Sequence, residues 1–371
     1  MSIALAGLMY FISLVKYCSC MLVLLALAAC GQNEPAEALT AAPDRPNFVI
    51  IMTDDMGFTD FGAFGGRDMK TPNLDNLALN GIRFTNFHGH LSCAPSRAML
   101  MSGMGNHEAG LGTQRDIERF RGERNYERYL VDRVATLPEI LADAGYRTYL
   151  AGKWGLGGPQ ALDPTQRGFG KAFALVPSGG GHLQALFHES RYTFNGKPVT
   201  EPEDPIYSTT LFTDQLIAFF EEDRGSDQPF FALFAPTAPH WPLHMPPGMK
   251  VSDEASYDGG YDKLRSLRLA GAALAGVLPE GVNSNPYPSK AIPWDSLDTE
   301  EKALQIKVME IYAAMIGHLD QEVGRLLNYL QDMGALENTL ILVINDKGAQ
   351  GGPVFGGPPS YLKDRSFDNR P

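Results

Sequence analysis

The sequence has few cysteines and no excess of basic residues. Cysteine occurs four times in 371 residues, at positions 18, 20, 30 and 93, and no Cys/His cluster has the spacing of a zinc site. Lys and Arg number 31 against 43 Asp and Glu, which gives a formal net charge of −12. The strongly basic footprint of a nucleic-acid-binding protein is therefore absent, and we expect no nucleic-acid partner. A local group of cations could still bind an anionic substrate.

The overall composition is that of a folded globular chain. Hydrophobic residues make up 44% and charged residues 20% of the sequence, with 39 Gly and 26 Pro. These proportions exclude a disordered, collagen-like or coiled-coil protein, and we find no internal repeat. The length allows two domains or one large α/β domain.

The first 29 residues have the pattern of an export signal. Lys16 is their only charged side chain, and residues 21–29 form an apolar run that ends in small residues. The run LAACG at 27–31 resembles a bacterial lipobox, in which Cys30 carries the lipid. Cleavage after Ala28, without lipid, is the alternative.

We favour the lipobox because the following residues are polar and rich in Pro and Ala, as in a tether. The sequence thus predicts a lipoprotein signal peptide at 1–29 and a flexible tether at 30–45. The protein would be an exported bacterial lipoprotein, periplasmic or at the cell surface, held at the outer membrane through the lipid on Cys30.

Cys93 would then be the only thiol of the exported domain. A lone cysteine is most often a small buried hydrophobe. The residues around Cys93 favour a functional role instead, as described below.

The body of the chain alternates between strand and helix patterns. Apolar runs of strand length lie at 47–52, 147–151, 229–235 and 339–344. Helical patterns lie between them at 136–145, 209–222 and 300–333. This alternation predicts an α/β fold with a mainly parallel sheet flanked by helices on both faces. The Pro- and Gly-rich stretch 246–293 is predicted to be irregular.

Polar side chains follow each predicted strand. Asp54 and Asp55 follow the first, Lys153 the second, His240 the third and Asp346 the fourth. Each alone has an ordinary structural explanation, such as a turn aspartate or a solvated lysine. Because ligands of α/β sheets bind at the carboxyl ends of the strands, all of them together predict one site.

The residue types at this site indicate a hard metal ion beside an anion. Three carboxylates offer only oxygen ligands, which suits Ca²⁺ or Mg²⁺ and not zinc, and of the two ions we expect Ca²⁺. Arg97, Lys153 and His240 supply donors for a sulfate- or phosphate-like group.

The run CAPSRAMLMSG at 93–103 resembles the sulfatase signature. Pro95 suits the first turn of a helix and Gly103 its end. The resemblance implies that Cys93 is oxidised to formylglycine by a formylglycine-generating enzyme. The aldehyde then hydrates, one hydroxyl attacks sulfur and the other expels sulfate, while Arg97 steadies the hydrate.

Five further segments carry the same resemblance. They are PNFVIIMTDDMG at 46–57, NHEAGLG at 106–112, GYRTYLAGKW at 145–154, GGGH at 179–182 and APTAPHWP at 235–242. NHEAGLG and GGGH resemble the bacterial arylsulfatase branch in particular. The similarity extends over residues 46–350, which are identified as a sulfatase N-terminal catalytic domain of the alkaline phosphatase-like superfamily.

The resemblance also assigns roles to single residues. The metal ligands would be Asp54, Asp55, Asp346 and residue 93. Cys93, Arg97, Lys153 and His240 would be catalytic, and the substrate would be bound by Lys153, His240 and His182.

Two residues depart from the family pattern. Lys347 stands where the family usually has Asn, and an ammonium has no acceptor to offer a metal. It would either swing out while water fills the site, or sit as a surrogate charge near the carboxylates. Gly155 stands where the family has a His that helps to orient formylglycine. We also expect the smaller C-terminal domain to be missing and 351–371 to form an irregular truncated tail.

The sequence therefore predicts a sulfuric ester hydrolase of the arylsulfatase type, acting through formylglycine and calcium on a small-molecule or glycan sulfate ester. Two alternatives stay open. One is a catalytically impaired pseudo-sulfatase lipoprotein or gene fragment, favoured by Lys347, Gly155 and the truncation. The other is a phosphonate or phosphate monoester hydrolase on the same scaffold.

Overall fold

The computed structural model describes residues 45–113, 117–157, 163–183, 192–199, 207–249, 257–279, 282 and 292–349. The chain divides into two compact units, 1–45 and 46–371, and the second is described here. The predicted signal peptide, Cys30 and the tail 351–371 lie outside the described residues. Within the described ranges, none of the helices combines the length and apolar character needed to cross a bilayer.

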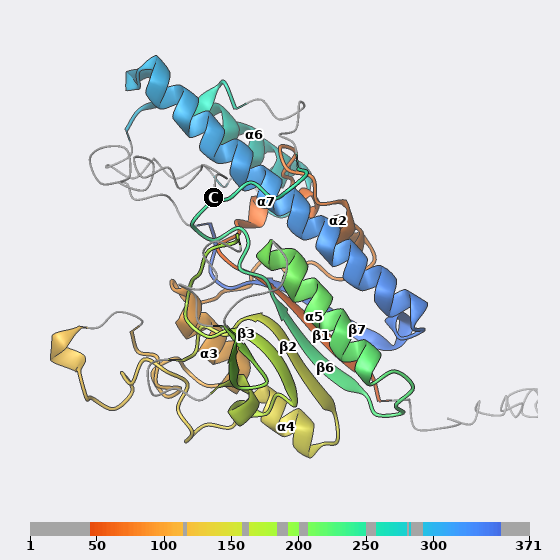
Figure 1. Ribbon diagram of the computed structural model, residues 1–371. Helices are drawn as coiled ribbons and strands as arrows, with labels where there is room; N and C mark the ends of the chain where they lie inside the picture. Colours follow the sequence, from red (N-terminus) through yellow and green to blue (C-terminus); the bar gives the residue numbers. More distant parts are fainter. Residues whose placement is uncertain are drawn as a thin grey trace, which may run out of the picture. The chain divides into compact units, whose positions relative to one another are not determined.

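The centre of the fold is a seven-stranded sheet with the order β5-β4-β3-β2-β6-β1-β7 (Figure 1). The strands are β1 (Asn47–Thr53), β2 (Arg147–Lys153), β3 (Lys171–Leu175), β4 (Tyr192–Phe194), β5 (Lys197–Val199), β6 (Phe230–Ala235) and β7 (Thr339–Asn345). The five strands from β3 to β7 in this order are parallel, and the β4–β5 hairpin adds an antiparallel edge. The predicted mainly parallel sheet is confirmed, and the four apolar runs form β1, β2, β6 and β7.

Six α-helices accompany the sheet in the part of the chain that the structure describes. They are α2 (Pro72–Leu79), α3 (Cys93–Ser102), α4 (Leu137–Asp143), α5 (Ser208–Glu222), α6 (Gly260–Leu274) and α7 (Thr299–Asp332). Short 3₁₀ turns lie at Phe58–Asp60, Gly62–Phe64, Glu118–Phe120, Pro164–Arg167, Trp294–Ser296 and Leu336–Asn338. A capping box opens α4, because Thr136 Oγ1 accepts from the Glu139 amide and the Glu139 carboxylate accepts from the Thr136 amide.

Alternate residues of each parallel strand face opposite layers of helices. Ile51 belongs to the cluster that contains Phe212 of α5 and Leu319 of α7. Its neighbour Ile50 belongs to the other cluster, which contains Ala98 of α3. Because both faces are covered, the strands read as continuous apolar runs, and the predicted helices on both faces are confirmed (Figure 1).

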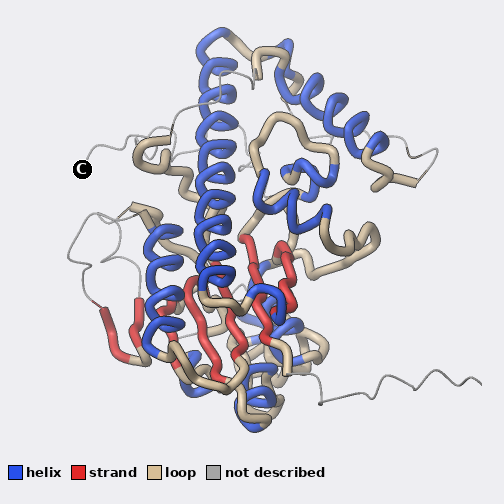
Figure 2. Tube along the Cα trace, turned by 90° about the vertical axis from the view of Figure 1, so that its right-hand side faces the viewer, coloured by secondary structure: helices blue, strands red, loops and turns tan. Residues whose placement is uncertain are grey.

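The longest helix, α7, has 34 residues and a length of about 50 Å. Figure 2 shows it crossing the strands and continuing beyond them. Its buried residues begin at Ile311, and just before it the partly buried Val308 and Met309 pack against the core. Asp298 caps the helix by accepting from the Glu301 amide at 2.8 Å.

Helix α6 was not predicted, because it lies inside the stretch 246–293 that was expected to be irregular. Its buried residues are small, while Leu267 and Leu274 are exposed, and it is held by a close backbone approach and by ion pairs. A Cβ on Gly271 would lie 2.0 Å from the carbonyl oxygen of Gly65. Arg268 pairs with Asp60 and Asp68 at 2.5 and 2.6 Å. Anchors of this kind leave no hydrophobic period in the sequence.

Candidate active site

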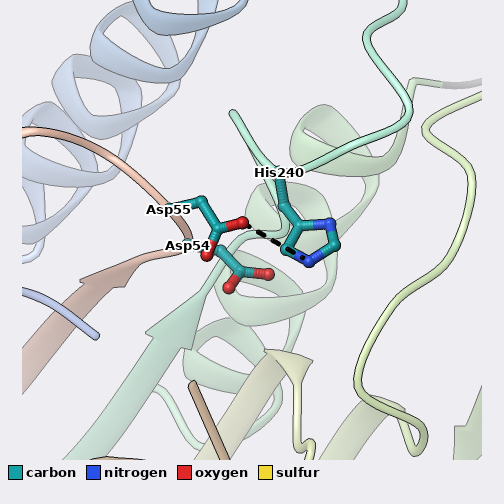
Figure 3. Close-up of side chains that lie close together, drawn as sticks. All are labelled: Asp54, Asp55 and His240. Atoms are coloured by element: carbon teal, nitrogen blue, oxygen red, sulfur yellow. Dashed lines mark ion pairs between the residues drawn. The ribbon is translucent and has the colours of Figure 1, made fainter. Parts of the chain in front are cut away.

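The carboxyl ends of β1, β2, β6 and β7 bring together the polar residues that follow these strands. All four strands are parallel neighbours in the order β2-β6-β1-β7, so their ends lie at one edge of the sheet. Oxygen atoms of Asp54 and Asp55 and a nitrogen of His240 all lie within 4.8 Å of one another (Figure 3). The same holds for Asp54, Cys93 and Asp346. Two overlapping groups of potential ligands therefore share Asp54.

Asp54 is completely buried and is neutralised by two cations. Lys153 Nζ lies 2.9 and 2.7 Å from its two carboxylate oxygens, and Arg97 Nη2 lies 3.6 Å from Oδ1. Burial opposes ionisation of Asp54, but the charges of Lys153 and Arg97 outweigh it and hold the pKa of Asp54 below its usual range. Asp54 is therefore an anion within a preformed group of cations.

Asp346 is the third carboxylate and is held by Arg97. The Arg97 Nε and Nη2 atoms lie 3.0 Å from Asp346 Oδ2, and Arg97 Nη1 donates to the Lys153 carbonyl at 2.9 Å. Burial and the nearby negative charge of Asp54 raise the pKa of Asp346 to about 6. Two carboxylates this close to each other favour a cation between them.

Cys93 is the first residue of α3 and is 4% exposed. The turn before it is fixed by Ser96, whose hydroxyl accepts from the His90 amide at 2.8 Å and donates to the His90 carbonyl at 3.2 Å. Gly103 ends the helix with a left-handed φ of 65°, as the motif predicts. The motif thus holds the side chain of residue 93 at a helix N-terminus, beside Asp54 and Asp346.

Asp55 faces the same cluster because its backbone is left-handed. Consecutive residues of a strand point to opposite sides, but Asp55 has a φ of 65°. Asp tolerates this conformation better than most residues. Its amide donates to Asp346 Oδ1 at 3.3 Å, and Tyr312 of α7 donates to its carbonyl at 3.3 Å.

The Asp55 carboxylate faces Lys347 and His240. Lys347 Nζ lies 2.7 Å from Oδ1, and His240 Nε2 lies 3.5 Å from Oδ2 (Figure 3 shows the latter). The ring of His240 is oriented by Nδ1, which lies 2.5 Å from the carbonyl oxygen of Trp241. Of the two positions expected for Lys347, the structure has the surrogate charge near the carboxylates.

His182 lies behind His240 and is 1% exposed. Its Nε2 donates to the His240 carbonyl at 2.8 Å, and its Nδ1 lies 3.1 Å from Ser208 Oγ. Burial lowers the pKa of His182 to about 3, so the ring is neutral. Both ring nitrogens are engaged within the protein, so His182 supports the His240 segment in this structure and does not point into the cluster. The substrate-binding role expected for His182 stays a prediction.

Gly155 adopts a left-handed φ of 68°. A Cβ at this position would lie 3.2 Å from Lys153 Cε and 3.5 Å from Arg97 Cδ. A side chain here would therefore strain the backbone and press on the aliphatic parts of two residues of the cluster. Because residue 155 is glycine, this position has no side chain in place of the imidazole of the family pattern.

Comparison with known proteins identifies the family of the chain. The profile of the sulfatase family matches residues 46–369. The chain belongs to the sulfatase family.

Three relatives illustrate the match. Over 352 residues the chain is 40% identical to an uncharacterized sulfatase of Schizosaccharomyces pombe, with 89% of this chain and 63% of the relative covered. It is 35% identical to an arylsulfatase of Klebsiella aerogenes, with 90% and 73% covered. It is 28% identical to an N-acetylglucosamine-6-O-sulfatase of Bacteroides thetaiotaomicron, with 88% and 61% covered. The chain thus spans less than two thirds of the first and third of these relatives.

Solved structures show the same fold. The structure of Ps i-CgsB in complex with k-i-k-neocarrahexaose has a TM-score of 0.57 and 25% identity, covering 83% of this chain and 61% of that one. The phosphonate monoester hydrolase of Agrobacterium radiobacter has a TM-score of 0.53 and 22% identity, covering 85% and 66%. The second likeness shows the fold alone. The alkaline phosphatase-like α/β fold expected from the sequence is confirmed.

The sulfatase family generally uses a divalent metal, and the donor set here fits one. Apart from the ion pairs with Lys347 and His240, both oxygens of the buried Asp55 carboxylate have no hydrogen-bond partner among the described residues. Together with Asp54, Asp346 and the residue-93 position they form an oxygen-rich site typical of hard cations. The Lys347 ammonium beside Asp55 opposes a cation there.

Sequence analysis missed several residues that build this site. Tyr312 and Asp55 are 257 positions apart, and nothing in the sequence connects them. Asn345 Oδ1 accepts from the Met56 amide at 2.9 Å and from Thr53 Oγ1 at 3.1 Å, which ties the ends of β1 and β7 together. Its position directly before Asp346 is the only signal that could have indicated this role.

Proposed function

We propose that the chain forms the catalytic domain of a sulfuric ester hydrolase of the arylsulfatase type. The reaction is R–O–SO₃⁻ + H₂O → R–OH + HSO₄⁻, with cleavage of the bond between sulfur and the ester oxygen. One observation carries the proposal: Cys93 Sγ and oxygens of Asp54 and Asp346 lie within 4.8 Å of one another at the start of α3. Lys153 and Arg97 lie directly beside this group.

The residues of the site have distinct roles in this proposal. When present, formylglycine at position 93 supplies a hydrated aldehyde as the nucleophile, and a calcium ion supplies positive charge next to the sulfate. Asp54, Asp55, Asp346 and residue 93 would hold the ion. Lys153 uses two contacts on Asp54, which leaves one N–H for a sulfate oxygen.

His240 is suited to hold the leaving oxygen. Its Nδ1 is turned to the Trp241 carbonyl, so Nε2 is the nitrogen directed into the site. Because the Nδ1–H donates to that carbonyl, a proton at Nε2 requires the imidazolium form, which would donate it to the departing alkoxide and become neutral. Arg97 would orient residue 93 and the carboxylates, because all of its contacts above are to site residues or their backbone.

The test replaces the proposed nucleophile. The protein is produced together with a formylglycine-generating enzyme and assayed with 4-nitrophenyl sulfate. Cys93→Ala is expected to lower turnover by at least about 1000-fold, because loss of a nucleophile removes the covalent pathway. Ser266→Ala on α6, whose hydroxyl donates to the Asp262 carbonyl, is the control and is expected to be fully active. Undiminished turnover by Cys93→Ala would end the proposal.

Mass spectrometry of the peptide containing residue 93 tests the modification directly. Conversion of the CH₂–SH group to an aldehyde is expected as a defined mass loss. A converted residue 93 without turnover of any ester would favour the alternative of a catalytically impaired pseudo-sulfatase.

The substrate class is part of the proposal. The named relatives include an arylsulfatase and a sugar sulfatase, so we propose an aryl or glycan sulfate ester. Faster turnover of an aryl phosphate or phosphonate monoester than of the sulfate would favour the phosphonate hydrolase alternative.

We also propose that the protein is an exported lipoprotein. The support is the run LAACG at 27–31 with its apolar segment before and its tether after. Metabolic labelling with a fatty acid tests this, with Cys30→Ala as the matched variant. Equal labelling of both proteins would contradict a lipid on Cys30.

A further inference from the structure

The side of the cluster around Asp55 holds a charge that the metal site proposed above does not need. Lys347 Nζ lies 2.7 Å from Asp55 Oδ1, and Asp55 is 2% exposed. Both oxygens of this carboxylate are otherwise without a hydrogen-bond partner among the described residues. The ammonium thus lies on a carboxylate that is in place to bind a cation.

Counting the charges of the cluster shows what Lys347 changes. Three carboxylates, Asp54, Asp55 and Asp346, carry −3, while Arg97, Lys153 and Lys347 carry +3. The sum is zero before any metal binds. With a neutral residue at position 347 the sum would be −1, which would attract a divalent ion.

Geometry makes the two cations exclude each other. A calcium ion binds carboxylate oxygen at about 2.3–2.6 Å, so it would lie within roughly 5 Å of the Lys347 Nζ atom if both contacted Asp55 Oδ1. Like charges at that distance repel strongly in a partly buried site. Lys347 also cannot join the coordination, because an ammonium has no lone pair.

The lysine can nevertheless leave. Its side chain is 15% exposed, in contrast to Lys153, which is 0% exposed. A flexible four-carbon stem attached next to Gly348 allows the ammonium to turn to solvent. Metal binding would then require displacement of one ion pair.

We propose that Lys347 is an internal counter-ion that occupies the Asp55 side of the cluster and competes with a divalent cation for it. The inference rests on the proposed function, because it assumes that the cluster is a metal site. It adds that Lys347 lowers the affinity of this chain for a divalent ion. In the absence of the ion, the Lys347 ammonium neutralises the Asp55 carboxylate.

Calorimetric titration of the full chain with CaCl₂ or MgCl₂ tests the competition without measuring turnover. Lys347→Met keeps the stem and removes only the charge, whereas Lys347→Asn removes the charge and adds an amide oxygen. We expect Lys347→Met to bind Ca²⁺ on the order of 100-fold more tightly than the wild type, the scale of a cation–cation repulsion at this distance. Lys347→Asn is expected to bind at least as tightly as Lys347→Met.

Lys307→Met is the matched control, because Lys307 pairs only with Glu310 on the surface of α7 among the contacts described. Its calcium affinity should equal that of the wild type. Thermal unfolding with and without CaCl₂ is the second readout, since a bound ion raises the melting temperature by mass action. The rise is expected to be larger for Lys347→Met than for the wild type.

Two results would overturn the inference. If Lys347→Met binds calcium no better than the wild type while Lys347→Asn does, the missing ligand matters and the charge does not. If neither the wild type nor any variant binds Ca²⁺ or Mg²⁺, the cluster is not a metal site. Failure of the proposed function has a different signature, namely absence of Cys93-dependent hydrolysis, which leaves the binding result standing.

Discussion

The two neighbouring carboxylates Asp54 and Asp55 lie in different surroundings. Asp54 is enclosed by Lys153 and Arg97, both at most 2% exposed. Asp55 faces Lys347 and His240, which are 15% and 22% exposed. The charge of Asp54 is therefore balanced by buried cations that cannot leave. The charge of Asp55 is balanced at the solvent side, by Lys347, which can turn away and give its place to a ligand.

The largest expected effect is a difference in the free energy of unfolding between a variant of the Asp54 side and a variant of the Asp55 side. Lys153→Met leaves the buried Asp54 without its main partner and is expected to lower the free energy of unfolding by about 3–5 kcal/mol. Lys347→Met is expected to cost about 1 kcal/mol, because its partner can be solvated or bind calcium. Urea unfolding with and without CaCl₂ measures both.

Calcium should restore the stability of Lys347→Met but not that of Lys153→Met. Equal losses in the two variants, or equal rescue by calcium, would contradict the difference between the halves.

His182, which supports the His240 segment, is expected to make the free energy of unfolding depend on pH. The folded protein keeps His182 neutral down to a pKa of about 3, whereas the unfolded chain takes up the proton near pH 6.5. The stability gained from the neutral ring is therefore complete above pH 6.5 and is lost as the pH falls toward 3. The slope is at most about 1.4 kcal/mol per pH unit.

His182→Gln is expected to show a flatter loss of stability between pH 6.5 and 4.5 than the wild type, measured by urea unfolding at each pH. Identical slopes in the two proteins would mean that His182 is protonated in the folded state. That result would remove the argument that a neutral ring orients the His240 carbonyl.

A further expected effect concerns the left-handed backbone of Asp55. The single O–H of Tyr312 lies 2.7 Å from Asp60 Oδ2 and 3.3 Å from the Asp55 carbonyl oxygen, so the two acceptors share one proton. Tyr312→Phe removes this shared hydrogen bond and is expected to lower the free energy of unfolding by about 1.5–3 kcal/mol, the range for a hydrogen bond to a charged group. Tyr329→Phe, near the other end of α7, is the control. Equal effects of the two substitutions on urea unfolding would argue against a specific role of Tyr312.

The sequence predicted the half of the site that follows from strand ends and from the motif. Asp54, Lys153 and Asp346 each lie at or directly after an apolar run, so a parallel sheet brings them together without further information. Cys93 and Arg97 are one helical turn apart within a motif, so a helix fixes their relation. These residues depend on local patterns that are visible in the chain.

The other half depends on contacts that local patterns do not encode. The sequence left two positions open for the Lys347 side chain, turned out of the site or beside the carboxylates. Local sequence could not decide between them, because it is compatible with both. The left-handed φ of Asp55 is supported by Tyr312 from a distant helix. Helix α6, which holds Asp60 through Arg268, is itself held in place by a glycine contact and by ion pairs with residues far away in the sequence.

Strand β7 delivers both Asp346 and Lys347, and it is the end strand of the sheet within the described residues. Its alignment with β1 runs residue by residue from Asn47–Thr339 to Thr53–Asn345. A slip of this pairing by a single position would bring an ammonium to the place of a carboxylate and reverse the sign of the charge beside Arg97. The register of the edge strand β7 against β1 thus determines whether a carboxylate or an ammonium lies beside Arg97, and with it the sign of the charge that an ion meets there.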